Sequence, residues 1–447
     1  MSSVLSIGLR KFIFWFHLAA GVVAGSIIFV MSVTGVLLAF ERQIVAFAER
    51  HTRTVQPPAS DAPQLGLDAL VSKAREALPE GLPTHATLSA HPTTAALINF
   101  GREQVVLVDP YTGAVLGEGA TTLRGFFRVV IDWHRWLGAQ GERREIGRAI
   151  TGACNAAFVV LVISGFYLWW PRRWTRVALK TVIVPSLKLH GKPRDWNWHN
   201  AVGFWSAPAL FCIALTGVVM SYQSANNLIY TLTGSEPPPI PQRSLASPLG
   251  EVGAKQDGSM PSPQGSEPDG GGKRQTRPAG GATREQRGRT RAADESGSQP
   301  VVASLDAVLA AAVQQAPNWR LMNIRLPQPG APQMTIMIEE AISLHPYPRS
   351  TLTVDTATAA VVKWEPFATY NLGRTIRFWV RPVHTGEAGG LIGQIIAALV
   401  SAGGAVLVYT GLALAWRRIW QCVRRHRSID GLLARREEQD VARRQAS

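Results

Sequence analysis

The sequence predicts an α-helical membrane protein: a bundle of four membrane-spanning helices, built from two tandem repeats, with two small α+β modules outside the cytoplasm. Two observations lead to this prediction. The chain contains four long apolar stretches, and the first and last of them, residues 12–40 and 388–416, hold no Asp, Glu, Lys or Arg. A helix needs about 20 apolar residues to cross a bilayer, so both are long enough. The second half of the chain also repeats residue patterns of the first half, which predicts a duplication.

The charge distribution indicates a membrane rather than a nucleic acid as the surroundings of this chain. The formal net charge is +15, which in a soluble protein would suggest nucleic-acid binding. Here the basic residues cluster beside the apolar stretches, as they do at the cytoplasmic ends of spans. We therefore expect a lipid bilayer as a partner and no nucleic acid.

The first half of the chain is predicted to cross the membrane twice. A basic pair, Arg10-Lys11, ends residues 1–11, which we expect in the cytoplasm. The first span covers residues 12–40 and is not followed by the cleavage site of a signal peptide. Residues 41–145 then form the first outer module, and residues 146–170 return as the second span.

The second half follows the same plan, in the order cytoplasmic loop, third span, second outer module, fourth span and basic cytoplasmic tail: residues 171–198, 199–224, 225–387, 388–416 and 417–447. Within the second module, residues 235–300 are rich in Pro, Gly and Ser and show no apolar periodicity, so we expect a disordered linker there. Both termini are expected in the cytoplasm, because each lies beside a basic cluster.

Local patterns predict helices and strands in both modules. Apolar residues recur at helical spacing over Leu67–Leu78 and Leu305–Ala316. Val105–Leu116 predicts two strands joined by a turn, and Met334–Glu339 and Thr351–Trp364 predict further strands. Each module is therefore expected to combine helix and sheet.

The repeat is defined by residues at identical offsets. The first and third spans share a His, a Gly four residues later and a Thr-Gly pair 17 and 18 residues later: His17, Gly21 and Thr34-Gly35 against His199, Gly203 and Thr216-Gly217. The second and fourth spans share Ser164-Gly165 and Thr410-Gly411 near their ends. The turn at Asp109–Gly113 matches Asp355–Ala359, but the second copy lacks the Pro and the Gly, so we expect its hairpin to differ.

Four histidines form two sets related by the repeat. His17 and His199 lie near the inner ends of the odd-numbered spans, and His134 and His384 are expected near the outer ends of the even-numbered spans. An ionisable residue at membrane depth is a functional candidate by default. Because neutral imidazole is a common metal ligand and haem iron accepts axial histidines, the two sets predict two haems.

Other residues near the histidines fit the same hypothesis. Gly21 and Gly203 lie one turn beyond the inner histidines, where a small residue lets a flat ring approach the helix. Arg135, next to His134, is expected to pair with a haem propionate, as are Arg10, Arg172 and Arg381. No catalytic side chain beyond the haems is predicted.

These motifs together resemble the PepSY-associated transmembrane helix family, iron-regulated membrane proteins that include siderophore reductases. The resemblance rests on Arg10-Lys11-Phe12 with His17 and Gly21, on Asp132–Gly138, on His199 with Gly203, and on His384 with Gly386-Glu387. The turn at 108–113 is similar to the end of a PepSY module. The resemblance covers most of the chain except residues 235–300 and the tail.

The resemblance implies a multi-pass protein of the bacterial inner membrane with two b-type haems and two periplasmic PepSY-like modules. Its haem irons would be bound by His17, His199, His134 and His384, and its activity would be haem-dependent reduction of a ferric siderophore in the periplasm, with release of Fe(II). No flavin or nicotinamide domain is recognisable after Trp420, so a separate electron donor is expected, either a quinol or a cytoplasmic reductase.

Two other functions remain open at this stage. The histidines of an iron or siderophore permease component would line a transport path, although a cation path is expected to contain carboxylates as well. A non-enzymatic regulatory membrane protein would use its PepSY-like modules to bind a protein partner, but would not need histidines repeated inside the spans. Bound haem would distinguish the oxidoreductase from both.

Overall fold

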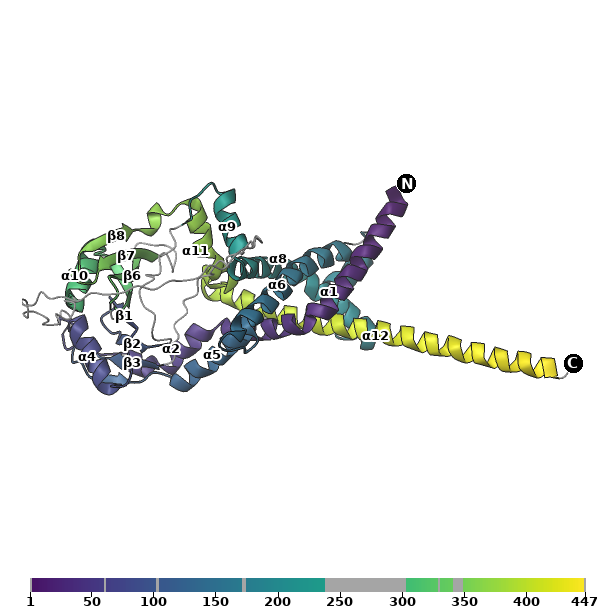
Figure 1. Ribbon diagram of the computed structural model, residues 1–447, viewed down its shortest axis with the longest axis horizontal. Coiled ribbons are helices and arrows are strands. Elements are labelled where there is room, and N and C mark those ends of the chain that lie inside the picture. The colour runs from purple at the N-terminus through teal and green to yellow at the C-terminus, as the bar shows by residue number, and fades with distance from the viewer. Residues whose placement is uncertain are drawn as a thin grey trace, which may run out of the picture.

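The protein has a helical bundle at one end and a β-sheet region at the other (Figure 1). The computed structural model describes residues 2–59, 62–101, 104–170, 174–237, 303–328, 330–340 and 349–445. The expected linker beyond residue 237 and Arg172 lie outside the described residues. Both chain termini lie on the side of the bundle that faces away from the sheet (Figure 1), so we call the two ends of the bundle the terminal side and the sheet side.

Four helices contain stretches long and apolar enough to cross a membrane: α1 (Ser2–Leu38), α6 (Arg143–Trp169), α8 (Gly191–Ser221) and α12 (Gly390–Gln445). α1 packs against α6 and α12, and α8 packs against the same two helices. The four helices therefore form a closed ring in which α1 and α8 lie diagonally opposite each other. Many large apolar side chains on the outside of the ring are exposed, as expected for a surface in contact with lipid.

Small and polar residues bring the four helices together. Gly25 of α1 faces Val408 and Leu412 of α12, where a side chain would meet them at ordinary contact distance. Asn155 of α6 donates a hydrogen bond to the carbonyl oxygen of Ala214 in α8 (2.9 Å). Close approach through small residues and hydrogen bonds between helices are the usual means of association where no water is present to drive apolar burial.

The sheet region is a single antiparallel sheet of eight strands in the order β4-β3-β2-β1-β5-β6-β7-β8. The strands are β1 (His85–Ser89), β2 (Ala96–Phe100), β3 (Gln104–Val108), β4 (Val115–Gly117), β5 (Trp319–Arg325), β6 (Gln333–Glu340), β7 (Arg349–Asp355) and β8 (Val361–Glu365). The expectation of two separate modules is corrected here. β1 and β5 pair antiparallel along their length, so the two halves share one sheet.

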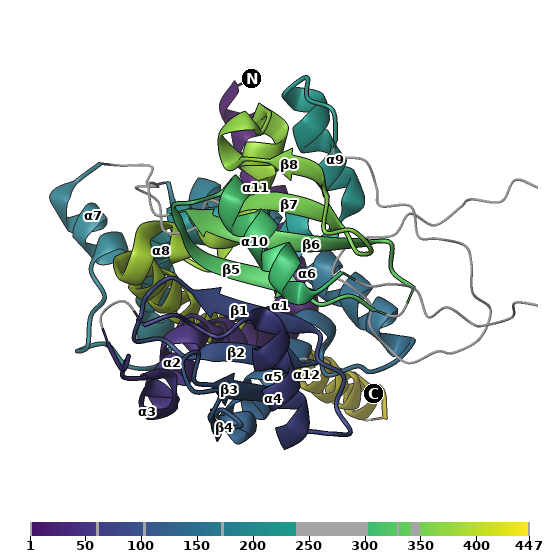
Figure 2. The ribbon, with the colours of Figure 1, turned by 90° about the vertical axis from the view of Figure 1, so that its left-hand side faces the viewer.

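Two helices cover one face of this sheet: α4 (Leu67–Ala77) and α10 (Leu305–Gln315) (Figure 2). Alternate strand residues point beneath them and form one continuous core, which includes Ile98, Ile324 and Leu352. The two helices are linked at their N-termini, where each aspartate accepts a hydrogen bond from the backbone N–H of the other: Asp68 N to Asp306 Oδ1 and Asp306 N to Asp68 Oδ2, both 3.1 Å. Each half therefore satisfies a free N–H of the other half's helix.

The second hairpin does not differ from the first, contrary to expectation. The N–H of Gly113 donates to the carbonyl of Asp109 (2.9 Å), and the N–H of Ala359 donates to the carbonyl of Asp355 (3.0 Å). Gly113 has φ 74°, and Ala359 takes the same left-handed conformation with φ 57°. Thr358 Oγ1 donates to the carboxylate of Asp355 (2.9 Å) and stabilises the turn without the glycine.

Shorter helices connect the sheet to the bundle and the spans to one another. They are α2 (Glu41–Ala48), α3 (Arg50–Arg53), α5 (Thr121–Trp136), α7 (Arg176–Ile183), α9 (Gln223–Leu232), α11 (Leu372–His384) and the 3-10 turns η1 (Phe367–Thr369) and η2 (Glu387–Gly389). α2 and α5 run between sheet and bundle on one side, and α9 and α11 on the other (Figure 1). α5 packs against α1, and α11 packs against α8.

Candidate functional site

The inner histidines face each other across the bundle. His17 lies on α1 and His199 on α8, the two diagonally opposite helices. Their ring centroids are 6.5 Å apart and their planes are perpendicular, at 90°. Two residues separated by 182 positions in the sequence are therefore neighbours in the centre of the ring.

The outer histidines also form a pair, but they do not lie on the spans. His134 is near the end of α5 and His384 is the last residue of α11. Their ring centroids are 6.3 Å apart with an interplanar angle of 66°. The predicted placement at the outer ends of the even-numbered spans is corrected here, because backbone turns separate α5 from α6 and α11 from α12.

Those turns have a clear cause in backbone conformation. Leu137 and Gly138 have φ of 54° and 75°, and Gly386 and Gly390 have φ of 76° and 58°. A residue in the left-handed conformation ends a helix and changes the direction of the chain, and glycine adopts this conformation without strain. The connecting segments are similar in length, so His134 and His384 occupy equivalent places at the ends of two amphipathic helices.

A hydroxyl group holds each of the four rings at Nδ1. Every hydroxyl comes from a helix other than the one that carries the histidine, at these distances: Ser164 to His17 2.8 Å, Thr410 to His199 3.0 Å, Thr34 to His134 2.9 Å and Thr216 to His384 3.2 Å. Helices α6 and α12 thus anchor the inner pair, and helices α1 and α8 anchor the outer pair.

The hydrogen bonds of these hydroxyls determine the tautomer of each histidine. A hydroxyl has one proton, and each of these four donates it to a carbonyl four residues earlier in its own helix, at 2.6 to 2.7 Å: Ser164 to Val160, Thr410 to Val406, Thr34 to Val30 and Thr216 to Cys212. Each hydroxyl must then accept from the histidine, so Nδ1 carries the ring proton. Nδ1 of His199 and of His384 also lies within 3.1 Å of a carbonyl oxygen, which can only accept. In all four neutral rings the unprotonated nitrogen is Nε2.

A glycine follows each hydroxyl residue and leaves room for the ring that the hydroxyl holds. A Cβ atom added at these positions would lie 3.1 to 3.7 Å from the Cε1 atom of the histidine: Gly165 beside His17, Gly411 beside His199, Gly217 beside His384 and Gly35 beside His134. The sequence showed these Ser/Thr-Gly pairs only as markers of the repeat. For Thr34-Gly35 and Thr216-Gly217 the identical offsets from His17 and His199 marked the repeat, but these pairs contact His134 and His384 instead.

The geometry of both pairs fits a metal held between two imidazoles. With metal–nitrogen bonds of about 2 Å on either side, two such rings have centres about 6 Å apart. Within the described ranges, no group of three or more His, Cys, Asp or Glu residues could hold a metal ion. A bare ion would therefore lack ligands, whereas haem iron needs only two axial ligands because the porphyrin supplies the other four nitrogens. The residues present fit a haem at each pair.

The outer pair stays uncharged at neutral pH, which a metal ligand requires. Burial, together with the neighbouring His384 and Arg135, lowers the pKa of His134 to about 4, outweighing the hydrogen bond that favours its charged form. Burial likewise lowers the pKa of His384.

The two predicted glycines face neighbouring helices instead of the histidine rings, and Arg135 lies next to His134. A Cβ atom at Gly21 would lie 3.9 Å from Leu161, and one at Gly203 would lie 3.5 Å from Leu407, so both face side chains of a neighbouring helix. The guanidinium of Arg135 stacks over the ring of Trp136, 4.7 Å from its centroid.

Two further predicted arginines have defined surroundings. Arg10 donates to the carbonyl of Leu168 (2.6 Å) at the C-terminal end of α6. Burial, and next the charge of Arg42, lower the pKa of Arg381, while Glu387 acts in the opposite direction. Glu387 itself pairs with Arg42 (3.2 Å), so charged residues gather on the sheet side of the outer pair.

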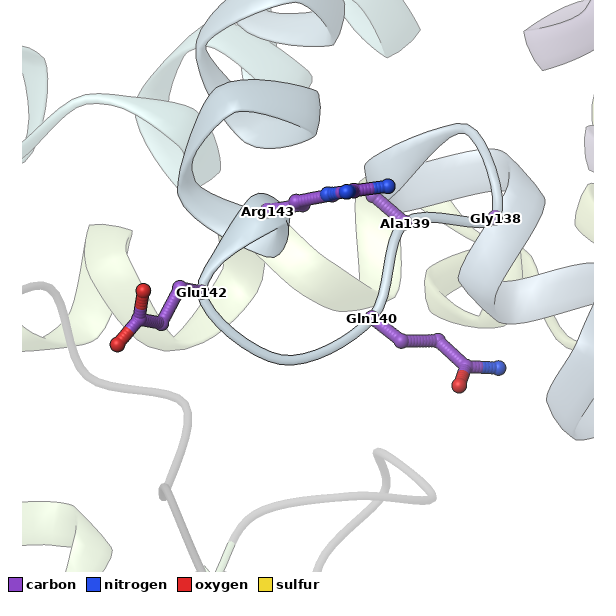
Figure 3. Close-up of a pocket in the computed structure, with 5 residues that line it drawn as sticks. All are labelled: Gly138, Ala139, Gln140, Glu142 and Arg143. Atoms are coloured by element: carbon purple, nitrogen blue, oxygen red, sulfur yellow. The ribbon is translucent and has the colours of Figure 1, made fainter.

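A surface hollow of about 530 Å³ lies at the loop between α5 and α6, lined by Gly138, Ala139, Gln140, Glu142 and Arg143 (Figure 3). Arg143 extends across the loop towards Ala139, and the side chains of Gln140 and Glu142 point away from each other (Figure 3). The loop, not the histidines, forms this hollow.

Comparison with protein families identifies a match to this chain. A model of the family described as PepSY-associated TM region matches residues 14–418, a range that contains all four histidines and their hydroxyl partners. Comparison with curated proteins finds no match.

Proposed function

Because the chain belongs to the PepSY-associated TM region family, we propose that it is a haem oxidoreductase of the bacterial inner membrane that moves electrons across the bilayer and reduces ferric siderophore iron in the periplasm. One observation carries this proposal: two histidine pairs, each with ring centres 6.3 to 6.5 Å apart and each ring fixed at Nδ1 by a hydroxyl.

In this proposal each pair would hold one b-type haem through Nε2: His17 and His199 would bind the inner haem, and His134 and His384 would bind the outer haem. When bound, haem iron supplies a one-electron redox couple whose potential depends on its ligands and their hydrogen bonds. The hydroxyls fix the ring orientation, and hydrogen bonds of this kind raise the basicity of the ligating nitrogen. Gly21, Gly203 and Arg135 would lie at the edges of these sites.

The spacing of the two pairs supports electron movement across the bilayer. On α1, His17 belongs to the inner pair, and Thr34, 17 residues later, holds His134 of the outer pair. Seventeen residues of helix rise about 26 Å, which approaches the roughly 30 Å of the hydrocarbon core. The pairs would thus lie near opposite faces of the membrane.

Basic residues on the terminal side support the proposed orientation. Arg10-Lys11 and Arg417-Arg418 lie at the terminal-side ends of the apolar stretches of α1 and α12, and the positive-inside rule supports a cytoplasmic location of both termini and a periplasmic location of the sheet. The matching anchors and turns of the two halves, and the reciprocal hydrogen bonds of Asp68 and Asp306, support a duplicated unit of span, PepSY-like module and span. A separate donor, either a quinol or a cytoplasmic reductase, supplies the electrons.

The proposed reaction needs no acid–base side chain. One electron converts the Fe(III) of the siderophore to Fe(II), which its hard oxygen ligands hold less tightly, so the iron is released. The protein's contribution is to position the electron carriers, exclude water from them and present the outer pair to the periplasm.

The test is anaerobic reoxidation of the reduced full-length protein. The purified protein should show a Soret band that shifts on reduction with dithionite. Addition of a ferric hydroxamate siderophore should reverse the shift and release one Fe(II), trapped by a ferrous chelator, per haem oxidised. The same siderophore loaded with Ga(III) is the matched control, because it has the same charge and shape but accepts no electron. A colourless protein, or equal reoxidation by both complexes, would contradict the proposal, and a colourless protein would favour a regulatory or transport function.

A further inference from the structure

Residues 174–189, which we call the α7 segment, join α6 to α8 on the terminal side, where the sequence predicted a cytoplasmic loop. α7 packs against α8, and it lies at the circumference of the molecule when the bundle is viewed along its length (Figure 2). Its first turn is capped by Thr175, whose hydroxyl accepts from the N–H of Ala178 (3.2 Å). Its other end is held in a less common way.

Side chains of the spans satisfy the backbone carbonyls at the end of α7. The last carbonyls of a helix have no partner within it and normally bind water. Here four consecutive carbonyls and that of Ser186 accept from Asn and Trp side chains of α6 and α8: Thr181 O from Asn197 (2.6 Å), Val182 O from Trp169 (3.3 Å), Ile183 O from Trp205 (3.0 Å), Val184 O from Asn197 (3.1 Å) and Ser186 O from Trp198 (3.0 Å). The N–H of Ser186 also donates to Asn197 Oδ1 (2.8 Å).

These hydrogen bonds also fix the depth of the segment. Asn197, Trp198 and Trp205 lie on α8 on either side of His199, the inner-pair histidine. Trp169 is the last residue of α6. The end of α7 is therefore level with the ends of the membrane-crossing helices, where water is scarce and a backbone outside a helix must find partners within the protein.

The α7 segment carries exposed apolar side chains and exposed basic side chains. Trp174, Val177, Val184 and Leu187 are 59%, 78%, 48% and 82% exposed, respectively. Arg176, Lys180 and Lys188 are exposed on the same segment. Four exposed large apolar residues within 14 positions are unfavourable in water, but this surface continues the exposed apolar surface of the spans, which contacts lipid.

We propose that the α7 segment lies in the bilayer interface on the terminal side, with its apolar side chains among the lipid chains and Arg176, Lys180 and Lys188 bound to anionic phospholipid headgroups. Lys and Arg can keep their charged ends at the headgroups while their apolar stems follow the segment. Because its backbone carbonyls are hydrogen-bonded within the protein, the α7 segment can enter the bilayer interface without losing bonds to water. Its exposed apolar side chains are more stable there than in water. The proposal stands on the fold alone and does not depend on haem binding.

Spin labels measure the depth of the segment directly. In full-length protein with its native cysteines replaced by alanine and reconstituted in phospholipid vesicles, nitroxides would be attached at Val177→Cys and Leu187→Cys. Two control sites bracket the outcome: Leu399→Cys on the lipid-facing surface of α12, 68% exposed, and Glu76→Cys on the sheet region, whose side chain is 60% exposed. We expect both α7 labels to be accessible to oxygen and protected from a water-soluble nickel complex, as at Leu399. Nickel accessibility equal to that at Glu76 would overturn the proposal.

A second measurement tests the headgroup contact. In mixed phosphatidylcholine and phosphatidylglycerol vesicles, spin-labelled phosphatidylglycerol should show a larger motionally restricted fraction than spin-labelled phosphatidylcholine. The triple variant Arg176→Gln, Lys180→Gln, Lys188→Gln should lose most of this excess. The control variant Lys73→Gln, Arg75→Gln, Arg325→Gln removes three charges from the sheet region and should retain it. An unchanged excess in the α7 variant would disprove the role of its basic residues.

Discussion

Four hydroxyl groups, each followed by a glycine, control the orientation and the proton of the four histidines. Each hydroxyl donates a hydrogen bond to a backbone carbonyl and accepts a hydrogen bond from Nδ1 of the histidine. Each glycine leaves space at Cε1 of the same ring. The sequence indicated the histidines through their repeated offsets. It could not indicate which hydroxyl anchors which histidine, because each anchor lies on another helix at least 100 residues away.

Ser164→Ala tests the anchor of the inner pair. The variant removes the acceptor of the His17 Nδ1 proton, so the ring loses its fixed orientation and part of its basicity. Loss of a hydrogen bond to a ligating histidine typically weakens metal binding about 10- to 100-fold. We expect a loss of this order in haem affinity at the inner site only, measured by haem transfer to apomyoglobin.

Ser206→Ala is the matched control for this substitution. Ser206 is a buried serine of α8 that donates to the carbonyl of Val202 but holds no histidine. It should retain both haems with unchanged affinity. Equal haem loss in the two variants would show that the anchor has no specific role.

Gly165→Ala tests the space beside His17. The new Cβ atom would lie 3.1 Å from Cε1 of the ring, closer than ordinary contact. Crowding of this kind typically costs about 1–3 kcal/mol, and we expect the ring to move and the spectrum of the inner haem to change. Gly25→Ala, where the nearest atom lies at an ordinary contact distance of 3.4 Å, should leave both spectra unaltered. An unchanged spectrum in Gly165→Ala would contradict this role.

The turn at Ala359 is strained at a single residue. A left-handed backbone costs an L-residue about 1–2 kcal/mol, a cost that glycine does not have. Ala359→Gly should therefore stabilise the sheet region by about 1 kcal/mol, measured as a rise in the midpoint of thermal unfolding followed by circular dichroism. Ala360→Gly, one residue later and without the left-handed backbone, should not stabilise it.

At the scale of elements, local sequence patterns predicted the individual helices and strands but not which strands pair with each other. The apolar spans, the helices near residues 67 and 305 and the strands near 105, 334 and 351 have strong local signals, and the structure contains each of them. Thr351–Trp364 is two strands, β7 and β8, joined by the turn at Asp355. The pairing of β1 with β5 joins residues about 235 positions apart, and no local pattern encodes such a contact.

The connection between α3 and α5 depends on one buried carboxylate. Glu49, 2% exposed, accepts from Arg53 Nε (2.8 Å), from Arg124 Nε and Nη2 (2.7 and 2.8 Å) and from the N–H of Ala120 (2.9 Å). Burial alone would raise the pKa of Glu49, but the hydrogen bonds from Arg124, Ala120 and Arg53 together lower it below its ordinary value of 4.5. The ionised form is thus favoured in the folded protein.

Glu49→Gln should destabilise the protein in a pH-dependent way. Because the folded pKa is lowered, the carboxylate contributes its full stability above about pH 4.5 and loses it as the pH falls through the folded pKa. We expect a loss of about 3 kcal/mol at pH 7, shrinking below pH 4.5, in thermal unfolding of the full-length protein. Glu76→Gln, an exposed control, should change little. A difference independent of pH would contradict the role of the charge.

At the scale of the whole molecule, the closed ring of spans and the single sheet place the two histidine pairs one above the other. The sequence predicted four spans and the membership of each pair, and the structure brings both pairs together. The prediction from the sequence placed His134 and His384 at the outer ends of the even-numbered spans. The structure places them on α5 and α11, because turns at Leu137 and Gly386 separate these helices from the spans that follow. Whether each pair holds haem is the central claim.

Haem counting in single-histidine variants tests that claim most directly. The haem-to-protein ratio, from a pyridine haemochromogen assay and amino-acid analysis, should be about two for the unmodified chain. It should be about one for His17→Ala and for His134→Ala, with different residual spectra because the remaining haem differs. All four hydroxyl residues remain in place in both variants, so each surviving pair keeps both of its anchors. A ratio unchanged in both variants, or no haem in the unmodified protein, would contradict the assignment of one haem to each pair.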